Sequence, residues 1–284
     1  MLSRILASLM LCALATGARA QELRLPVLEL GIAGGGGYLP DYPAADEGRV
    51  RGIAAPYLIY RGEILRSDDR GTRLRAALTD DIEFSLSASG SLPVSSGDNE
   101  ARRGMPDLDL LAEIGPLLRL TLWRGGTAGR PIRLVVDTSL RAVFSTDFSS
   151  ISYRGLTFAP DISLEARNVA LPFSRLRATL GVTFATDRFM EYFYEVRPEF
   201  ARADRPAFGA QGGYLGARAS LSYRFALSER LSAAVSTRVD YYGGAANRDS
   251  PLFRRDWNAS ATLGFAYSLW RSEERVAVDT DVFD

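Results

Sequence analysis

The feature that most constrains the fold is a two-residue alternation of apolar and polar side chains, repeated along most of the chain. Successive side chains of a β-strand point to opposite faces of a sheet, so the alternation predicts strands with one apolar and one polar face. No helical period fits these segments, and the chain is predicted to be all-β. The clear runs are 82–89, 132–144, 176–184, 219–227, 231–241 and 259–269, with weaker copies at 74–78, 118–122 and 162–166.

The length of the alternating runs separates two kinds of β-protein. Strands of soluble proteins usually have about 5–6 residues, whereas a tilted membrane-spanning strand needs about 9–11. Several runs in this chain sustain the alternation for that longer distance. An open sheet edge in lipid would leave backbone groups unpaired, so the sheet should close on itself. We therefore predict a closed antiparallel transmembrane β-barrel of about twelve strands, with ten as the alternative, because bacterial barrels usually have even numbers.

The first twenty residues have the three parts of a secretory signal peptide. Arg4 is the positive residue, 5–16 is a short apolar run, and Ala18-Arg19-Ala20 has the small-x-small form of a cleavage site. The expected organisation is a signal peptide at 1–20, a barrel at 21–270 and an acidic tail at 271–284. A cleaved signal followed by a barrel predicts export to the outer membrane and contact with its lipid. The only cysteine, Cys12, lies in the expected signal peptide.

Two missing residue types exclude many functions. The sequence contains no histidine and no lysine, and all of its positive charge is arginine. Serine and cysteine hydrolases built on histidine, imidazole metal sites, Schiff-base chemistry and a phosphate-binding P-loop lysine are therefore absent. The formal net charge of zero argues against nucleic acid as a partner. We predict that the protein is not an enzyme and that it has no catalytic residues, no cofactor and no metal site.

Turns and loops are expected to differ between the two ends of the barrel. Ser228-Glu229-Arg230 is a tight polar turn, whereas 37–50, 197–213 and 243–256 are long and rich in Gly, Pro, Asp and Arg. Short turns on the periplasmic side and long loops outside are typical of barrels. The segment 90–109 does not fit this scheme, so either a strand is missed there or its loop lies on the other side. Aromatic residues near strand ends are interpreted as interface girdles: Tyr57, Tyr60, Trp123, Tyr192 to Tyr194, Tyr241, Tyr242, Trp257 and Trp270.

The polar faces of the strands carry many charges. Unpaired charges in a narrow lumen are unfavourable, so these residues should form salt-bridge networks. A barrel of this size is only a little wider than one that its own side chains fill, and a mostly plugged lumen follows. The candidate lumen charges are Arg133, Asp137, Arg141, Glu165, Arg177, Arg224, Arg238 and Asp240.

A stiff loop near the N-terminus is the candidate partner-binding segment. Prolines lower the entropy lost when a loop binds, and loops on a rigid scaffold often carry function. The alternative is a rigid loop that caps the barrel mouth. The glycine run Gly34 to Gly37 before it lacks the spacing of a phosphate-binding loop, so it is interpreted as a site of close packing or a bulge. The candidate binding residues are Tyr38, Pro40, Asp41, Tyr42, Pro43, Asp46 and Glu47.

The same segment resembles the opening motif of the MipA/OmpV family. The residues from Gly34 to Glu47 follow the family pattern, although Ala44-Ala45 stand where it has Gly-Ser. Weaker matches lie at Gly104-Met105-Pro106-Asp107-Leu108-Asp109, Glu113-Ile114-Gly115-Pro116 and Asp249-Ser250-Pro251-Leu252. The resemblance implies an outer-membrane scaffold, MltA-interacting, that brings together two peptidoglycan enzymes, a lytic transglycosylase and a murein synthase. Some members of the family are described as porin-like or adhesin-like, so a small-solute channel or a surface adhesin is the alternative.

Overall fold

The computed structural model describes residues 23–60, 65–68, 71–74, 76–79, 81–127 and 129–278. The signal peptide expected at 1–20 lies outside these residues, as do the last six residues of the expected tail. Almost all of the described secondary structure is β-strand, which confirms the all-β prediction.

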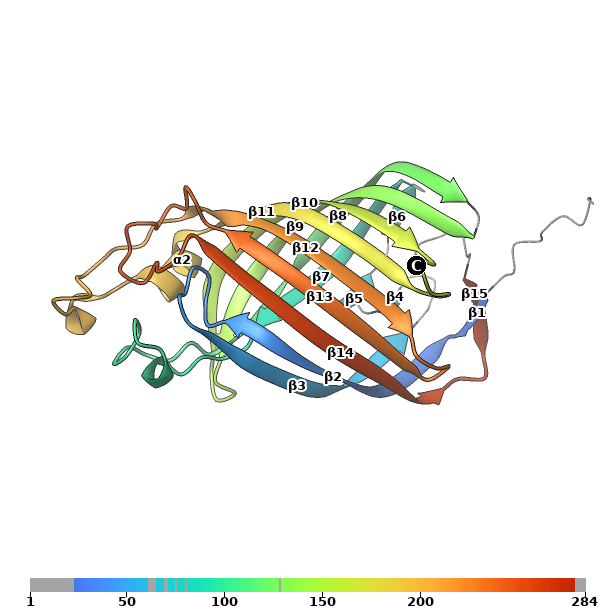
Figure 1. Ribbon diagram of the computed structural model, residues 1–284, viewed down its shortest axis with the longest axis horizontal. Coiled ribbons are helices and arrows are strands. Elements are labelled where there is room, and N and C mark those ends of the chain that lie inside the picture. The colour runs from blue at the N-terminus through green and yellow to red at the C-terminus, as the bar shows by residue number, and fades with distance from the viewer. Residues whose placement is uncertain are drawn as a thin grey trace, which may run out of the picture.

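Ten long strands make the body of the molecule, and each has between 10 and 18 residues. Most reach or exceed the length that a tilted strand needs to cross a bilayer. The strands lie oblique to the long axis of the molecule (Figure 1). They are β2 (Leu28–Pro40), β3 (Gly48–Tyr60), β7 (Ile82–Ser91), β8 (Leu110–Thr127), β9 (Arg130–Thr146), β10 (Ile151–Arg167), β11 (Arg175–Ala185), β12 (Gly213–Ala226), β13 (Leu231–Tyr241) and β14 (Trp257–Arg271).

The helical elements are short and lie in the loops. They are α2 (Asp187–Tyr194) and the single 3₁₀ turns η1 (Ser96–Asp98) and η2 (Pro198–Phe200). Among the residues described, no helix has the length and apolar character needed to cross a membrane.

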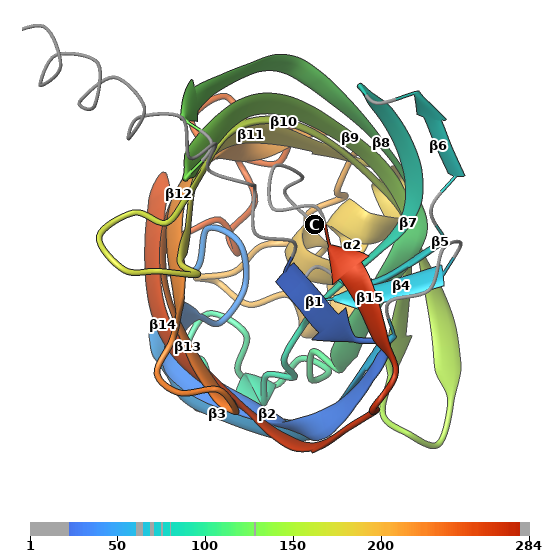
Figure 2. The ribbon, with the colours of Figure 1, turned by 90° about the vertical axis from the view of Figure 1, so that its right-hand side faces the viewer.

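The long strands pair antiparallel with their neighbours, and β2 also pairs with β14, which joins the two ends of the chain. The resulting sheet runs in the order β3-β2-β14-β13-β12-β11-β10-β9-β8-β7-β6, where β6 is Ala76–Thr79. A separate hairpin is formed by β4 (Leu65–Asp68) and β5 (Gly71–Leu74). Viewed from one end, the sheet curves into a ring, with β4 and β5 between β3 and β7 (Figure 2). Among the described pairs, β3 and β6 are the two edges of the sheet. The closure of the sheet into a barrel and the total of about twelve strands therefore stay predictions.

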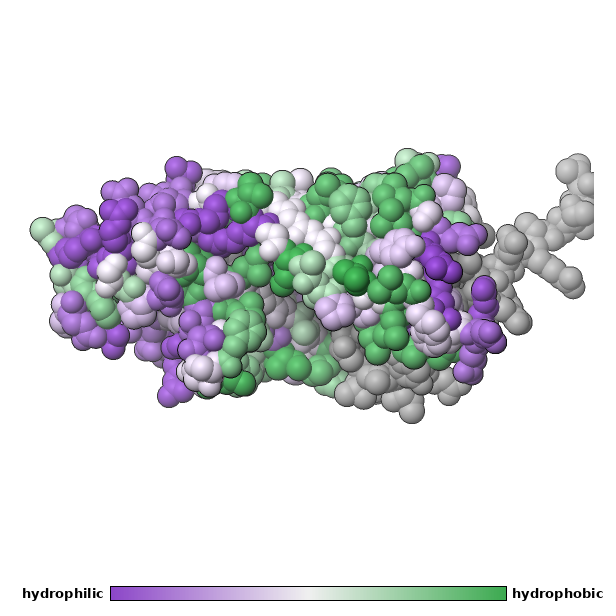
Figure 3. Space-filling model, turned by 90° about the horizontal axis from the view of Figure 1, so that it is seen from below, coloured by the Kyte–Doolittle hydropathy of each residue, from purple (hydrophilic) through white to green (hydrophobic). Residues whose placement is uncertain are grey.

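The outer face of the sheet is apolar, as the alternation predicts. On β14, Leu263, Phe265, Tyr267 and Leu269 are 45–55% exposed, whereas Ser268 on the other face is 1% exposed. Such residues form a broad apolar zone over the strands, with hydrophilic surface over the loops and near the opposite end (Figure 3). An apolar outer face on a sheet with a polar inner face is the arrangement that a lipid bilayer requires.

The connections differ between the two ends of the sheet. The loops 41–47, 92–109, 186–212 and 242–256 lie at one end, together with the tight turn at 147–150. The opposite end carries shorter links, among them 227–230 and 168–174. The segment 92–109 therefore lies at the long-loop end as the barrel scheme requires. The misfit arose because the sequence showed alternation only over 118–122 of this strand, and weakly there, whereas β8 begins at Leu110.

The predicted aromatic girdles are right in part. Trp123, Tyr241, Trp257 and Trp270 lie on the outer surface and are 41–57% exposed. Tyr57 instead faces the lumen, where its hydroxyl donates a hydrogen bond to Glu29 (3.1 Å). The prediction is wrong for the other described members because they belong to the packed loops: Tyr192 and Tyr194 lie on α2, and Tyr242 is 5% exposed. The side chain of Tyr60 is not among those described.

The glycine run lies in the middle of β2 rather than at a bulge. Gly35 and Gly37 face the lumen, and β2 is paired on both sides, with β14 and β3. A Cβ atom on Gly35 would lie 2.6 Å from the carbonyl oxygen of Leu263, and one on Gly37 would overlap the carbonyl oxygen of Ala261. The predicted close packing is confirmed, because only glycine lets the neighbouring backbone approach so closely.

The first and last described strands pair beyond the short-turn end of the barrel. A two-stranded ribbon is formed by β1 (Leu23–Pro26) and β15 (Arg275–Val278). The backbone of Ser272 donates to Leu28 (2.8 Å) and that of Val27 donates to Glu274 (2.9 Å), so the ribbon continues from the β14–β2 pair. In Figure 2 the ribbon crosses the opening of the ring. Residues 275–278 of the expected tail are thus paired with β1.

Candidate functional site

The lumen is the first candidate site, and all eight charged residues predicted for it lie on the inner face of the sheet. Residues directly paired in a β-ladder share a face. The register aligns Arg133 with Glu165 and Glu165 with Arg177, and farther along it aligns Arg238 with Ser220 and Asp240 with Arg218. Because these strands are neighbours in the sheet, the inward charges fall within reach of one another.

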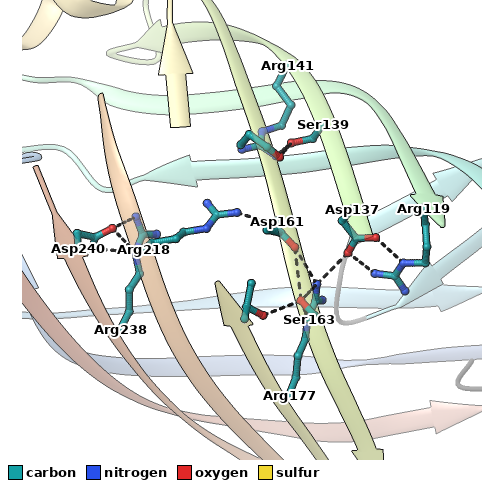
Figure 4. A network of polar contacts seen from close by, with 12 residues as sticks. Arg119, Asp137, Ser139, Arg141, Asp161, Ser163, Arg177, Arg218, Arg238 and Asp240 are labelled. Carbon is teal, nitrogen blue, oxygen red and sulfur yellow. Dashed lines mark hydrogen bonds and ion pairs between the residues drawn. The ribbon is translucent and has the colours of Figure 1, made fainter. Parts of the chain in front are cut away.

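Asp137 on β9 is the centre of a salt-bridge network (Figure 4). It accepts hydrogen bonds from Nε and Nη2 of Arg119 on β8, both at 2.6 Å, and one from Arg177 on β11 at 2.8 Å. Asp137 is 3% exposed and Arg119 2% exposed. Arg119 and Asp137 thus form a bidentate contact that is shielded from water. In this geometry the attraction between two buried charges can offset the free energy lost on desolvation.

Two more carboxylates extend the network across β10. Glu165 is fully buried and lies 2.8 Å from Nη2 of Arg133 and 3.6 Å from Nε of Arg177. Asp161 lies 2.8 Å from Arg218 on β12 and 3.7 Å from Arg177. Arg177 therefore contacts three carboxylates, and the strands β8 to β12 are joined through their side chains as well as their backbones.

Two further pairs lie in the lumen. Arg238 contacts Asp240 on its own strand (2.6 Å), and Arg141 contacts Glu113 (2.9 Å). Arg224 lies beside Arg175 in the register and lines the same cavity as Arg177. All eight of these charged residues therefore lie on the inner face of the curved sheet.

Four network residues were not predicted from the sequence: Arg119, Asp161, Arg218 and Glu113. Each lies beside or within a run of alternation that was identified, one or a few residues beyond its clear part. Asp161, for example, precedes Ile162 and shares a face with Glu165 four residues later. Extending each run to the full length of a membrane strand would have found them.

The lumen wall opposite the network is uncharged over much of its area. A cavity of about 1070 Å³ is lined there by small and apolar residues of β2, β3, β13 and β14, such as Ala33, Gly35, Ala55 and Ala234. Arg177 and Arg224 reach the same cavity from the charged side. The lumen is therefore divided into a filled half and a hollow half.

The second candidate site is the predicted partner-binding loop, which forms part of a cap over the long-loop end. The side chain of Asp41 is fully buried and contacts Arg51 (2.5 Å), Arg49 (3.0 Å) and the amide of Asn99 (2.9 Å). Asn99 belongs to the loop 92–109, so Asp41 ties that loop to the start of β3. A buried carboxylate with three donors is strongly held in place.

The neighbouring residues connect the same loop to the two other long loops. The hydroxyl of Tyr42 donates to the carbonyl of Leu252 (2.9 Å), and that of Tyr194 donates to the carbonyl of Pro43 (3.0 Å). Burial raises the pKa of Tyr42 and of Tyr194 well above the ordinary range, so both hydroxyls stay protonated as donors. The amide of Asn258 bonds the backbone of Ala44 and Ala45, both at 2.8 Å.

An apolar core lies beneath these contacts and closes the cap. It includes Val94, Phe189, Met190, Phe193 and Leu252, all at most 5% exposed. These residues come from the loops 92–109, 186–212 and 242–256, and Figure 2 shows α2 behind the opening of the ring. The long loops therefore pack against one another over one end of the lumen.

The burial of the loop limits which of its predicted residues a partner can touch. Asp41 and Tyr42 are buried within the cap. Tyr38 is 46% exposed on the outer face of β2, and Pro40, Pro43, Asp46 and Glu47 are half-buried. Asp46 contacts Arg254 (3.2 Å) and Glu47 accepts from the backbone of Glu100 (2.6 Å). The loop therefore lies in the cap over the barrel mouth, which is the position that the alternative interpretation gave it. Its role in binding a partner stays a prediction.

The departure from the family motif has a structural counterpart. Ala44 has φ of 65°, in the left-handed region that glycine adopts without strain. It is also fully buried, and its carbonyl accepts hydrogen bonds from the backbone of Arg254 (2.9 Å) and Arg255 (3.0 Å). This explains why the motif favours glycine at that position.

The salt-bridge network across the lumen and the packed cap predict that the protein does not conduct ions. In single-channel recordings across a planar bilayer, the purified protein should show no stable open level, because the network and the cap obstruct the path. A porin reconstituted in the same membrane is the positive control. A steady large conductance would contradict this prediction.

Comparisons with known proteins relate the whole barrel to one family. The family model described as MltA-interacting protein MipA matches residues 32–269. No curated protein matches the chain.

Several solved structures are similar to this chain at low sequence identity. A bacterial polysaccharide outer membrane secretin is 11% identical, with 86% of this chain and 99% of that chain covered and a TM-score of 0.40. An outer membrane channel from Pseudomonas putida is 10% identical, with 90% and 100% covered and a TM-score of 0.40. The outer membrane phospholipase A from Escherichia coli is 10% identical, with 87% and 94% covered and a TM-score of 0.28.

Proposed function

The chain belongs to the MipA family of the outer membrane, and on this premise we propose that it is a non-conducting barrel on which peptidoglycan enzymes assemble. The observation that carries the proposal is the obstructed lumen. Because salt bridges cross the lumen and loops cap one end, a partner would bind to the outer surfaces of the barrel rather than inside it. The description of the family model, MltA-interacting protein, supports a lytic transglycosylase as one partner, with a murein synthase as a second.

The two ends of the barrel indicate where such a partner would bind. Outer-membrane barrels keep short turns in the periplasm and long loops outside. Peptidoglycan lies in the periplasm, so its enzymes would meet the turns 168–174 and 227–230 and the β1–β15 ribbon. The loop 38–47 faces the opposite side in this orientation. We therefore place the enzyme-binding surface at the short-turn end, and a partner of loop 38–47 would be extracellular.

We also propose that the barrel closes with twelve strands. The β4–β5 hairpin lies between β3 and β7 in the ring (Figure 2), where the described sheet has its two edges. Counting β5 and β6 as two parts of one strand, the hairpin adds two strands to the ten long ones. Closure is favoured because unpaired backbone groups in lipid cost several kcal/mol each.

Crosslinking from matched positions at the two ends tests the binding surface. A photo-crosslinking residue at Glu229 would probe the short-turn end, and one at Ser149 would probe a turn of the long-loop end; both positions are exposed. Crosslinked products from intact envelopes would be identified by mass spectrometry. We expect a lytic transglycosylase or a murein synthase from Glu229 and neither from Ser149. Enzymes captured only from Ser149, or from neither position, would overturn the assignment.

One observation favours the alternative of a small-solute channel. The hollow half of the lumen, about 1070 Å³, is large enough for a small molecule. If the barrel crosslinks no enzyme and shows a steady conductance, this function replaces the scaffold. An adhesin would instead use the exposed loops at the other end.

A further inference from the structure

An open cleft lies among the capping loops at the long-loop end. It is formed by the loops 92–109 and 186–212, which include α2 (Figure 1), together with the start of β10. Its volume is about 570 Å³. Sites for small ligands usually have volumes of about 300–1,000 Å³. Arg188, Glu191 and Arg197 are exposed members of the lining, so a ligand could enter from solvent.

Opposite charges balance in the lining of this cleft. The lining has four arginines and four acidic residues, so its formal charge is zero: Arg102, Arg154, Arg188 and Arg197 against Asp107, Asp109, Glu191 and Glu195. A lining without net charge attracts neither a polyanion nor a polycation over long range. The cleft therefore favours a ligand that is uncharged overall.

Three of the acidic residues keep their carboxylates available to a ligand. Within the part of the chain that the structure describes, the carboxylates of Asp109, Glu191 and Glu195 accept no hydrogen bond and form no ion pair. Glu191 lies on α2 and Glu195 directly follows this helix, four residues later, so both reach the same cleft. An ionised carboxylate only accepts hydrogen bonds, and these residues therefore suit a ligand with several donors.

Arg154 on β10 supplies donors in a fixed position. Its Nε donates to Oγ of Ser145 (2.8 Å), and its guanidinium carbon lies 4.5 Å from the ring centroid of Tyr192. Tyr192 is itself held, because its hydroxyl donates to the backbone carbonyl of Asp109 (3.4 Å). Among the described residues, none accepts a hydrogen bond from the two terminal nitrogens of Arg154. A stacked guanidinium of this kind is pre-organised to donate to a ligand.

Apolar surface lies beside these polar groups. Met105, Tyr153 and Phe200 belong to the same lining. The guanidinium carbon of Arg188 lies 5.7 Å from the ring centroid of Tyr153, and that of Arg197 lies 5.0 Å from the ring centroid of Phe200. The cleft thus combines acceptors, donors and aromatic rings within one lining.

A neutral sugar matches all three properties. Each sugar hydroxyl both donates and accepts hydrogen bonds, so neighbouring hydroxyls could donate to a carboxylate and accept from a guanidinium. The carbon-bound hydrogens of a sugar ring form an apolar face that packs against aromatic and aliphatic side chains. We propose that this cleft binds a neutral oligosaccharide, with Glu191 and Glu195 as acceptors and Arg154 as a donor.

The position of the cleft indicates two sources for such a ligand. With the long loops outside the cell, the cleft faces the surface polysaccharides of the bacterium itself and the glycans of other cells. Both sources offer the same hydroxyl chemistry. Binding at this cleft does not depend on any enzyme at the short-turn end, so this proposal and the scaffold proposal can fail separately.

An array of immobilised oligosaccharides tests the proposal with the full-length protein. The protein is kept in an amine-oxide detergent, because detergents with sugar headgroups would compete. Neutral fragments of bacterial surface polysaccharides and neutral animal glycans are compared with sialylated and sulfated glycans. We expect binding to neutral oligosaccharides from at least one source, with a change of less than about twofold between about 0.05 and 0.5 M salt. Binding to charged glycans alone, or to no oligosaccharide, would overturn the proposal.

A double substitution tests whether the binding occurs in this cleft. Glu191→Gln/Glu195→Gln nearly keeps the shape of the side chains but removes the charged acceptors, so binding should weaken about tenfold or more. Asp204→Asn/Asp249→Asn is the matched control, because these two carboxylates are exposed on the long loops and lie outside the lining. The control should change binding less than about twofold.

Two results with these variants would contradict the assignment. Binding that is unchanged in Glu191→Gln/Glu195→Gln would place the oligosaccharide elsewhere, and an equal loss in both double variants would indicate a general effect of charge. The electrophoretic shift on boiling verifies that each variant folds.

Discussion

Replacing Asp137 by alanine should lower the free energy of unfolding by about 3–5 kcal/mol, the usual effect of removing one partner of a buried ion pair. Asp137 accepts three hydrogen bonds, two from Arg119 and one from Arg177. Without it, the buried guanidinium of Arg119 keeps an ionic contact with Glu165 at 3.9 Å. Urea unfolding in lipid vesicles, followed by tryptophan fluorescence, measures the loss.

Two control variants distinguish loss of the pair from general damage. Arg119→Met/Asp137→Leu removes both charges and should recover most of the stability. Asp256→Ala removes the partner of Arg248 (2.9 Å), and the two side chains are 38% and 57% exposed, so the loss should be at most about 1 kcal/mol. If Asp137→Ala and Asp256→Ala lose the same amount, the buried network does not stabilise the barrel in this way.

Replacing Asp41 by alanine should release the cap without unfolding the barrel. The change leaves Arg51, Arg49 and Asn99 without the carboxylate that joins the loop 92–109 to β3. A loss of about 3 kcal/mol in local stability corresponds to roughly a hundredfold rise in the population of the open loop. Limited trypsin digestion after Arg103, measured by mass spectrometry, should accelerate by about that factor.

Glu47→Ala is the matched control for the cap. Glu47 also contacts the loop 92–109, through the backbone of Glu100, but at an exposed site. Its loss should change cleavage after Arg103 less than threefold, equivalent to the few tenths of a kcal/mol typical of surface contacts. If cleavage after Arg103 accelerated equally in both variants, the buried position of Asp41 would not strengthen its contacts with the loop 92–109.

The inner face of each strand could be predicted from the sequence because apolar and polar residues alternate along it. The face on which Arg133, Asp137 or Glu165 lies follows from the apolar residues on either side of it. The pairs that form could not be predicted, since the partner of Asp137 depends on the register between β8 and β9. Register is a relation between strands, and the pattern of a single strand does not contain it.

Two other parts of the fold could not be predicted from the sequence, for different physical reasons. The strand β2 contains the run Gly34 to Gly37, and glycine has no side chain from which an alternation can be read. The loop aromatics Tyr42, Tyr194 and Tyr242 are buried by contacts among three loops far apart in the sequence. Aromatic residues near strand ends serve a membrane interface and a loop core equally well, so position along the chain did not distinguish them.

The pairing of β2 with β14 has a consequence for the order of assembly. It joins segments more than two hundred residues apart, for example Tyr38 and Ala261, whereas every other pair of long strands is adjacent along the chain. Closing such a long loop carries the largest entropy loss, so local hairpins should form before this seam. Because glycine fills much of the seam, few side chains interlock there to guide it. The last step of barrel formation therefore depends mainly on the backbone hydrogen bonds that form between β2 and β14.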